Sequence, residues 1–97
     1  MLFVVYGDSN LALMENVYTL RILAVLYKDG PVFRSILYNK VSKSTVAPKA
    51  RVDELLEAGL LTEEVSQFPP LSKRIGLTPK GRKIAELVAE MEKILSE

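Results

Sequence analysis

The sequence contains no cysteine and no histidine among its 97 residues. Disulfide bonds, thiol nucleophiles and imidazole bases are therefore excluded, together with most zinc and copper sites. Oxygen ligands remain for Mg²⁺ or Ca²⁺, but no acidic cluster has the spacing of a calcium-binding loop. No apolar run approaches the ~20 residues that a membrane-spanning helix needs. We therefore expect no cofactor, no metal site and no membrane partner, with the cytoplasm as the default location.

The length and composition are those of one globular domain over residues 1–97. Hydrophobic residues make up 48% of the chain and charged residues 26%, which is the balance of a folded chain rather than a disordered one. The chain is too short for two separately packed cores. Residues 1–9 are expected to form a short N-terminal strand or arm, because Leu2 to Tyr6 are β-forming residues and Gly7-Asp8 ends the run.

The net charge is only +1, but the charges are grouped along the chain in blocks of one sign. Residues 30–52 and 65–83 contain basic residues and no acidic ones, whereas residues 53–64 contain acidic residues and no basic ones. If the fold brings the two basic blocks to one face, that face can bind a polyanion despite the near-neutral total. The alternative is that these runs are only solvated surface.

Apolar periodicity predicts a first helix through residues 16–28, and its start near Asn10 or near Asn16 stays open. Leu20, Leu23 and Tyr27 follow one another at helical spacing, and the apolar stripe is widened by Val17, Ile22, Val25 and Leu26. We expect a helix this apolar to be mostly buried. The helix should end at Asp29-Gly30, because glycine readily adopts the conformation that terminates a helix.

A second, shorter helix is predicted from Val32 to about Lys40. It follows Pro31 and is expected to direct Phe33, Ile36 and Leu37 inward.

A third helix is predicted over about residues 44–58, with Val52 and Leu55 inward. Its start is constrained by Pro48, which costs ~3 kcal/mol inside a helix but is tolerated in the first turn. Its end is marked by Gly59.

Residues 60–77 are predicted to form a β-hairpin, which we call the wing. Its strands are expected at 60–65 and 72–77, with Pro69-Pro70 at the tip because proline cannot donate to a strand ladder. The last helix is expected over residues 79–97, capped by Thr78 with proline in the first turn.

The predicted fold is mainly α with a small β-hairpin. Three helices followed by a hairpin and a further helix are typical of a winged helix-turn-helix protein, in which helices two and three form the helix-turn-helix. In that arrangement the third helix enters the major groove of DNA with its N-terminal residues toward the bases and phosphates. The wing can then reach the adjacent backbone.

Three segments resemble a known family. They are Gly30 to Leu37 (GPVFRSIL), Val52 to Leu61 (VDELLEAGLL) and Leu77 to Arg82 (LTPKGR). Their order and spacing are similar to those of small winged-helix transcriptional regulators of the MarR, HxlR and PadR kind, especially minimal archaeal ones. The resemblance implies a DNA-binding regulator. The chain departs from MarR-type wings because Phe68-Pro69-Pro70 stands in place of an Asp-Gly-Arg tip.

Basic and hydroxyl side chains of the helix-turn-helix and the wing are the candidate contacts with DNA: Arg34, Ser42, Lys43, Ser44, Thr45, Lys49, Arg51, Lys73 and Arg74. Arginine can bind guanine in bidentate fashion, lysine usually binds phosphate, and a helix N-terminus attracts anions. Each group has a structural alternative. The hydroxyls can cap helix three, Arg34 can pair with Glu15 or Asp29, and the wing cations can protect an exposed strand edge.

Apolar residues gather on one face of the last helix: Ile84, Leu87, Val88, Met91, Ile94 and Leu95. This face can cover the core or form a two-fold dimer. We favour a homodimer, which matches a palindromic site whose half-sites lie one helical turn apart.

The most favoured function is sequence-specific binding of double-stranded DNA by a transcriptional regulator. The alternative is a winged helix that binds protein and no DNA, favoured by the near-zero net charge and the apolar Phe68-Pro69-Pro70 tip. No motif indicates an enzyme.

Overall fold

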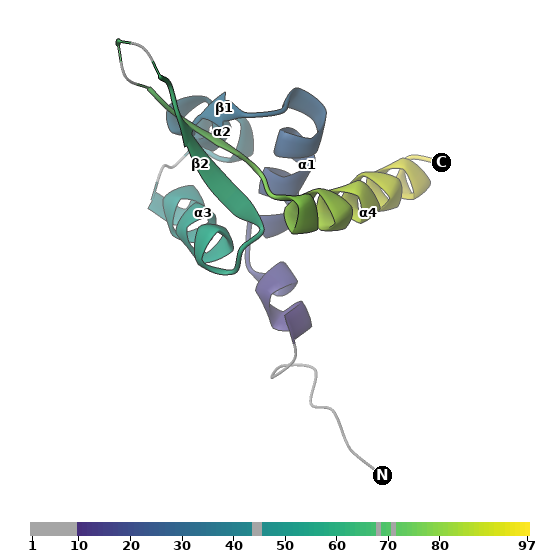
Figure 1. Cartoon of the computed structure of the whole chain (residues 1–97). Coiled ribbons are helices and arrows are strands. Elements are labelled where there is room, and N and C mark those ends of the chain that lie inside the picture. Colours follow the sequence, from purple (N-terminus) through teal and green to yellow (C-terminus); the bar gives the residue numbers. More distant parts are fainter. Residues whose placement is uncertain (1–9, 44–45, 68, 71) are drawn as a thin grey trace.

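The computed structural model describes residues 10–43, 46–67, 69–70 and 72–97. Its elements follow one another in the order η2 (Asn10–Glu15, a 3₁₀ helix), α1 (Thr19–Asp29), β1 (Val32–Phe33), α2 (Arg34–Val41), α3 (Val46–Glu57), β2 (Leu61–Val65), β3 (Lys73–Leu77) and α4 (Pro79–Leu95) (Figure 1). The N-terminal strand or arm expected at residues 1–9 lies outside the described residues.

The helix α1 lies at the centre of the fold. It contacts η2, α2, α3, α4 and the strand β3. The helices α2 and α3 lie on the side of the wing, whereas α4 runs away from the wing toward the C-terminus (Figure 1). The core draws residues from α1 to α4 and from the sheet: Ile22, Leu23, Leu26, Leu37, Tyr38, Val41, Val52, Leu55, Leu60, Leu61, Ile75, Ala85 and Val88.

The helix α1 begins at Thr19, later than either of the two expected starts near Asn10 and Asn16. The preceding residue, Tyr18, has a φ of 71° and a left-handed backbone conformation. A non-glycine residue in this region cannot continue a right-handed helix. The chain therefore changes direction between η2 and α1.

The buried face of α1 covers one side of the predicted apolar stripe. Leu23 is fully buried as expected, but Leu20 and Tyr27 are 39% and 36% exposed. Ile22 and Leu26 take their places in the core. The stripe of apolar residues on this helix is wide, so spacing alone does not decide which part of it faces inward.

The predicted start of the second helix at Val32 is wrong. Val32 and Phe33 form the short strand β1, which pairs antiparallel with β3 through Val32↔Ile75 and Phe33↔Arg74. β-Branched and aromatic residues suit a strand, and β3 offers backbone groups that need partners. The helix α2 therefore begins at Arg34, and the hairpin becomes a three-stranded sheet in the order β1-β3-β2.

This later start changes which side chains of α2 are buried. Phe33 and Ile36, both expected in the core, are 37% and 43% exposed. Leu37 is buried as predicted, together with Tyr38 and Val41.

The helix α3 agrees with the constraint that Pro48 imposes. It begins at Val46, so Pro48 lies in the first turn, where its missing N–H breaks no intrahelical hydrogen bond. Val52 and Leu55 face the core as predicted. Gly59 follows the helix with a φ of 79°, which favours glycine.

The strands β2 and β3 form the predicted hairpin, with a register that runs from Leu61↔Leu77 to Val65↔Lys73. Beyond the ladder, the Ser66 N–H donates to the Ser72 carbonyl at 2.9 Å. The Ser72 N–H donates in return to Ser66 Oγ at 3.1 Å.

The start of α4 is held against the base of the wing. Thr78 Oγ1 accepts from the Gly81 N–H at 3.0 Å and donates to the Gly59 carbonyl at 2.7 Å. Gly81 packs so closely on the Leu60 carbonyl that a Cβ atom at Gly81 would lie 1.8 Å from the Leu60 oxygen. Glycine is therefore required here by contact and not by its own torsion angles.

In the part of the chain that the structure describes, no helix combines the length and apolar character needed to cross a bilayer.

The contact at Gly81 predicts a large loss of stability for Gly81→Ala. The added methyl must push α4 away from the base of the wing, so we expect the free energy of unfolding to fall by at least ~2 kcal/mol. Thermal and urea unfolding measure this loss. The exposed neighbour Arg82 supplies the control, since Arg82→Ala should change stability by less than ~0.5 kcal/mol. Equal effects of the two substitutions would contradict the close packing.

Candidate nucleic-acid interface

The solvent-exposed face of α3 carries few positive charges. Lys49, Ala50 and Asp53 are exposed, and Val46 is 78% exposed. The opposite face of the helix, with Pro48 and the residues at helical spacing after it, is buried. Lys49 is therefore solvent-facing, as the sequence predicted.

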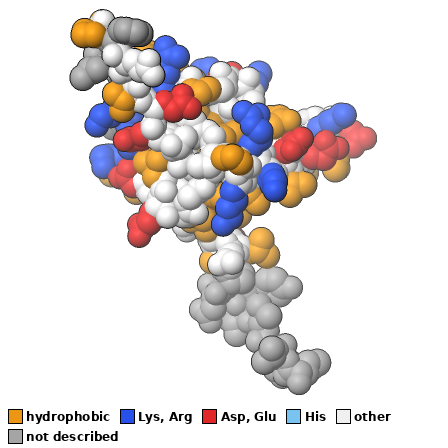
Figure 2. Space-filling view, in the orientation of Figure 1, with side chains coloured by type: hydrophobic (Ala, Val, Ile, Leu, Met, Phe, Trp, Pro, Cys, Tyr) orange, Lys and Arg blue, Asp and Glu red, His pale blue; other side chains and the backbone are white. Residues whose placement is uncertain are grey.

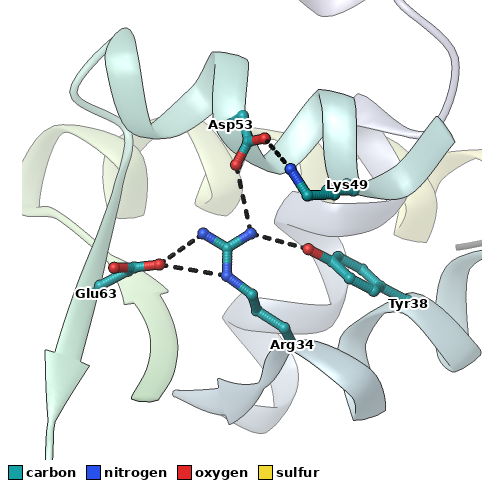
Figure 3. A network of polar contacts seen from close by, with 5 residues as sticks. All are labelled: Arg34, Tyr38, Lys49, Asp53 and Glu63. Atoms are coloured by element: carbon teal, nitrogen blue, oxygen red, sulfur yellow. Dashed lines mark hydrogen bonds and ion pairs between the residues drawn. The ribbon is translucent and has the colours of Figure 1, made fainter. Parts of the chain in front are cut away.

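Arg34 lies between α3 and the wing (Figure 3). Its Nη2 and Nε atoms donate to one oxygen of Glu63 in β2, at 2.5 Å and 3.2 Å. Its Nη1 atom donates to the Tyr38 hydroxyl at 2.8 Å and to Asp53 in α3 at 3.4 Å. Lys49 donates to the other oxygen of Asp53 at 3.0 Å. A single guanidinium thus joins α2, α3 and β2.

The alternative considered for Arg34, an ion pair with Glu15 or Asp29, does not occur. Asp29 pairs instead with Lys40. Glu63 lies 29 residues from Arg34 in the sequence, so no local spacing rule identifies it. Helical spacing indicates two contacts of this network, Arg34 with Tyr38 and Lys49 with Asp53, each at i,i+4.

These contacts shift the acid–base properties of the carboxyl groups. The hydrogen bond from Arg34 lowers the pKa of Glu63, and the nearby charge of Lys73 lowers it further. The hydrogen bond from Lys49 lowers the pKa of Asp53, with a smaller contribution from Arg34. For Arg34, partial burial lowers the pKa, but the hydrogen bonds to Glu63, Tyr38 and Asp53 outweigh it and raise the pKa above its ordinary value. All three groups are therefore charged at neutral pH.

Arg51 is placed differently from Lys49. Its side chain is only 22% exposed, and Nη2 lies 2.9 Å from Glu54 on the same helix. Its Nε atom is buried and has no hydrogen-bond partner among the described residues. The Glu54 carboxylate also accepts from Asn16 Nδ2 at 3.1 Å. Arg51 therefore belongs to the contact between α3 and the segment before α1.

The turn between α2 and α3 contains Ser42 and Lys43. Ser42 ends α2, where its N–H donates to the Tyr38 carbonyl at 3.0 Å and its hydroxyl donates to the Tyr18 hydroxyl at 3.3 Å. Lys43 is exposed, and none of the described acidic side chains lies within ion-pair distance of it. Ser44 and Thr45, expected to cap α3 or to bind phosphate, lie outside the described residues.

Lys73 and Arg74 lie side by side in β3 and are both exposed. Arg74 pairs with Glu64 in the ladder, and its guanidinium lies 5.1 Å from the centre of the Phe33 ring. This distance is that of a cation–π contact, which leaves the outer N–H groups available to other partners.

The two basic blocks of the sequence come together beside the acidic block. Arg34 of the first block bonds Glu63, and Lys73 of the second is close enough to change the pKa of the same carboxyl group. In Figure 2, Lys and Arg side chains alternate with Asp and Glu side chains on the side that holds the wing and α3. This face is therefore mixed in charge rather than uniformly basic.

A second surface is apolar and lies on α4. Leu87, Met91, Ile94 and Leu95 are 65%, 46%, 58% and 84% exposed. Val88 is only 7% exposed and belongs to the core. Of the six residues predicted for a dimer interface, Val88 is thus buried within its own chain, and Ile84 packs against the same core.

A groove runs between η2, α1 and α4 beside this apolar surface. Its apolar lining includes Leu11, Met14, Leu20, Ile84, Leu87 and Met91. Within residues 10–43, 46–67, 69–70 and 72–97, no three carboxylate side chains group in a way that could hold a metal ion.

No family model matches this sequence, and no curated protein is significantly similar to it in sequence. Solved structures are similar in fold. A possible HxlR family transcriptional factor from Thermoplasma volcanium GSS1 superposes with a TM-score of 0.80 at 20% identity, over 96% of this chain and 84% of that one. The reduced form of the transcriptional regulator YodB from B. subtilis gives 0.77 at 22% identity, over 95% and 90%. The MarR family transcriptional regulator SPO1453 from Silicibacter pomeroyi DSS-3 gives 0.74 at 22% identity, over 92% and 62%.

These similarities confirm the predicted fold: a winged helix-turn-helix with a small antiparallel sheet, of the kind found in HxlR and MarR regulators.

The lowered pKa values of Asp53 and Glu63 predict how stability depends on pH. Both carboxyl groups titrate lower in the folded chain than their ordinary pKa of ~4. Their ion pairs therefore stabilise the folded state above pH ~4, and this stabilisation is lost as the pH falls below that value. We expect Arg34→Met to lower the melting temperature at pH ~6 and to have a smaller effect at pH ~3.

Thermal unfolding of both proteins between these limits measures the difference. Arg82→Met, an exposed substitution of the same chemical type, should give a difference from wild type that does not change with pH. Parallel curves for wild type and Arg34→Met would contradict the assignment of these ion pairs.

Proposed function

We propose that this protein binds double-stranded DNA in a sequence-specific manner and acts as a transcriptional regulator. The observation that carries the proposal is that α3 and the wing meet on one face, joined through Arg34, in a fold similar to that of named transcriptional regulators. A winged helix of this kind presents its third helix to the major groove and its wing to the backbone. Such a protein acts where the DNA is, in the cytoplasm, and we assign it no enzymatic activity.

In the proposed complex, residues 44–58 lie in the major groove with the N-terminus of α3 toward the DNA. Lys43 approaches a phosphate from the turn, and Ser44 and Thr45 supply hydroxyl donors at the positive end of the helix. Lys49 lies on the exposed face one turn later and reaches a phosphate or a base edge once it leaves Asp53. Ser42 supports the turn through Tyr18, and Arg51 supports α3 through Glu54.

The wing supplies the second set of contacts. Lys73 and Arg74 are exposed in β3, and Arg74 is held in place by the Phe33 ring. A guanidinium that is already oriented loses less conformational entropy when it binds a phosphate. We therefore assign these two residues to the backbone beside the groove that α3 occupies.

We further propose a homodimer through the exposed apolar face of α4. Leu87, Met91, Ile94 and Leu95 form this face, and the groove beside it extends the apolar area toward Leu11. Ile84 lines the same groove, and Val88, which is 7% exposed, supports the face from the core. A two-fold dimer places two copies of α3 on successive major grooves, about 34–36 Å apart.

The second candidate function is a winged helix that binds another protein and no DNA. The exposed face of α3 favours it, because Val46 and Ala50 are apolar and Asp53 would repel phosphate. Pro69 and Pro70 near the wing tip are exposed as well.

DNA binding by the proposed contacts is tested with Lys43→Ala and with the pair Lys73→Ala and Arg74→Ala. We expect each variant to bind a selected duplex more weakly than wild type. Each lost phosphate contact should also reduce the slope of log affinity against log salt by ~0.9. Fluorescence anisotropy over a series of salt concentrations gives both quantities.

Lys93→Ala is the matched control, because Lys93 lies near the end of α4 that is remote from the wing (Figure 1). Its affinity and salt slope should equal those of wild type. Absence of wild-type binding to any duplex at low salt would reject the DNA-binding function and favour the protein-binding module.

The proposed dimer is tested by Leu87→Lys. A lysine in the centre of an apolar interface leaves a buried charge, so the dimer should dissociate at least ~10-fold more readily. Sedimentation velocity over a range of protein concentrations measures the dissociation.

Glu90→Lys introduces the same side chain at an exposed polar position of α4, with a charge change of two units instead of one, and should leave the dimer intact. A wild-type protein that stays monomeric throughout would refute the interface.

A further inference from the structure

Arg34 was a candidate DNA contact on the sequence alone, but its surroundings assign it a different role. We propose that Arg34 is a positioning residue, which fixes α3 against the wing and compensates two carboxylates on the binding face, without itself contacting DNA. The predicted effect of Arg34 on DNA affinity rests on the proposed function. The predicted restraint of α3 against the wing does not depend on DNA.

Four of the five N–H groups of the Arg34 guanidinium donate to protein side chains. Each of its three nitrogen atoms donates to a side chain of the protein: Nε and Nη2 to Glu63, and Nη1 to Tyr38 and Asp53 (Figure 3). A bidentate contact with phosphate or guanine needs two free parallel N–H groups on one edge. Glu63 occupies the edge formed by Nε and Nη2. The second edge, formed by Nη1 and Nη2, offers no free pair, because Nη1 donates to Tyr38 and to Asp53 and these contacts leave one N–H group, on Nη2.

Arg34 lies where α2, α3 and the wing meet. Its side chain joins β2 through Glu63 and α3 through Asp53. The preceding residue, Phe33, pairs with Arg74 of β3 through the backbone and also contacts the Arg74 guanidinium through its ring. Two adjacent residues therefore hold both strands of the wing at the N-terminus of α2. Because Arg34 also reaches α3, it sets the separation between the two elements that must fit the DNA together.

Arg34 also compensates negative charge on the face that holds α3 and the wing. Asp53 and Glu63 lie on the same face as the proposed phosphate contacts, with side chains 47% and 33% exposed. Bare carboxylates in this position would repel the DNA backbone. Arg34 and Lys49 balance them, so the four side chains form a neutral group. Removal of Arg34 would leave the group with a net negative charge and a less restrained wing.

The affinity test is a double-mutant cycle with Arg34→Met and Glu63→Gln. A positioning role predicts that Arg34→Met weakens binding to the selected duplex by about 10-fold in the wild-type background and by much less in the Glu63→Gln background, because the uncompensated carboxylate is then gone. The salt slope should stay unchanged, since no phosphate contact is lost.

A direct contact predicts the opposite coupling. Glu63→Gln would free Arg34 for the DNA and tighten binding, and Arg34→Met would then cost more in that background than in wild type. It would also reduce the salt slope by ~0.9. Either result would overturn the proposal.

The structural test uses no DNA. Because the chain has no cysteine, Ala50→Cys in α3 and Val65→Cys in β2 give a unique pair of spin labels at exposed positions. Electron-spin distance measurements should show a wider distribution of α3-to-wing distances after Arg34→Met, and no change after the control Arg82→Met. An unchanged distribution after Arg34→Met would overturn the positioning role.

Arg34→Lys is a second, more conservative variant that keeps the test valid if Arg34→Met does not fold. Lysine keeps the positive charge but presents one nitrogen, which cannot bond Glu63, Tyr38 and Asp53 in the same geometry. The label distances should widen at an unchanged salt slope. If wild type binds no DNA but the distances widen in both Arg34 variants, the proposed function fails and the structural role of Arg34 stands.

Discussion

Burial of the inner face of α1 is the interaction on which the rest of the structure depends. Ile22 and Leu23 are 0% exposed and Leu26 is 1% exposed, and burial of each such side chain stabilises the fold by roughly 1.5–3 kcal/mol. A helix of 11 residues is marginal by itself in water. The helix α1 is therefore stable because α2, α3, α4 and β3 pack around it, and their positions follow from where they contact it.

The charged residues of the binding face are linked to one another rather than arranged as a positive surface. Exposed ion pairs contribute only ~0–1 kcal/mol to stability. The pairs around Arg34 and Lys49 are partly exposed, so their main effect is on geometry and on the local potential. A face of this kind would bind DNA with modest electrostatic attraction. Shape and orientation would then carry more of the recognition.

The face formed by α3 and the wing and the apolar face of α4 have different roles in the proposed function. Under that proposal, the face formed by α3 and the wing would bind one half-site, and the apolar face of α4 would join two copies. The wing and α4, which carry these surfaces, are joined at the base of the wing. There Thr78 and Gly81 hold α4 against Gly59 and Leu60. The angle between the face of α3 and the wing and the apolar face of α4 is therefore set by close backbone packing.

The sequence by itself determined the fold class, the hairpin and the start of α3 after Ser42. It also determined the end of α3 before Gly59 and the start of α4 after Thr78. Each of these depends on local chemistry: a glycine that adopts a positive φ, a hydroxyl cap, a proline confined to a first turn. Only the tertiary structure decided that Val32 and Phe33 form a strand, that Ile22 and not Leu20 is buried, and that Arg34 bonds Glu63 and Asp53. These outcomes depend on residues distant along the chain, and neither periodicity nor charge runs specify which of those residues will be in contact. The same residues can satisfy several local patterns, and contacts across the fold select one of them.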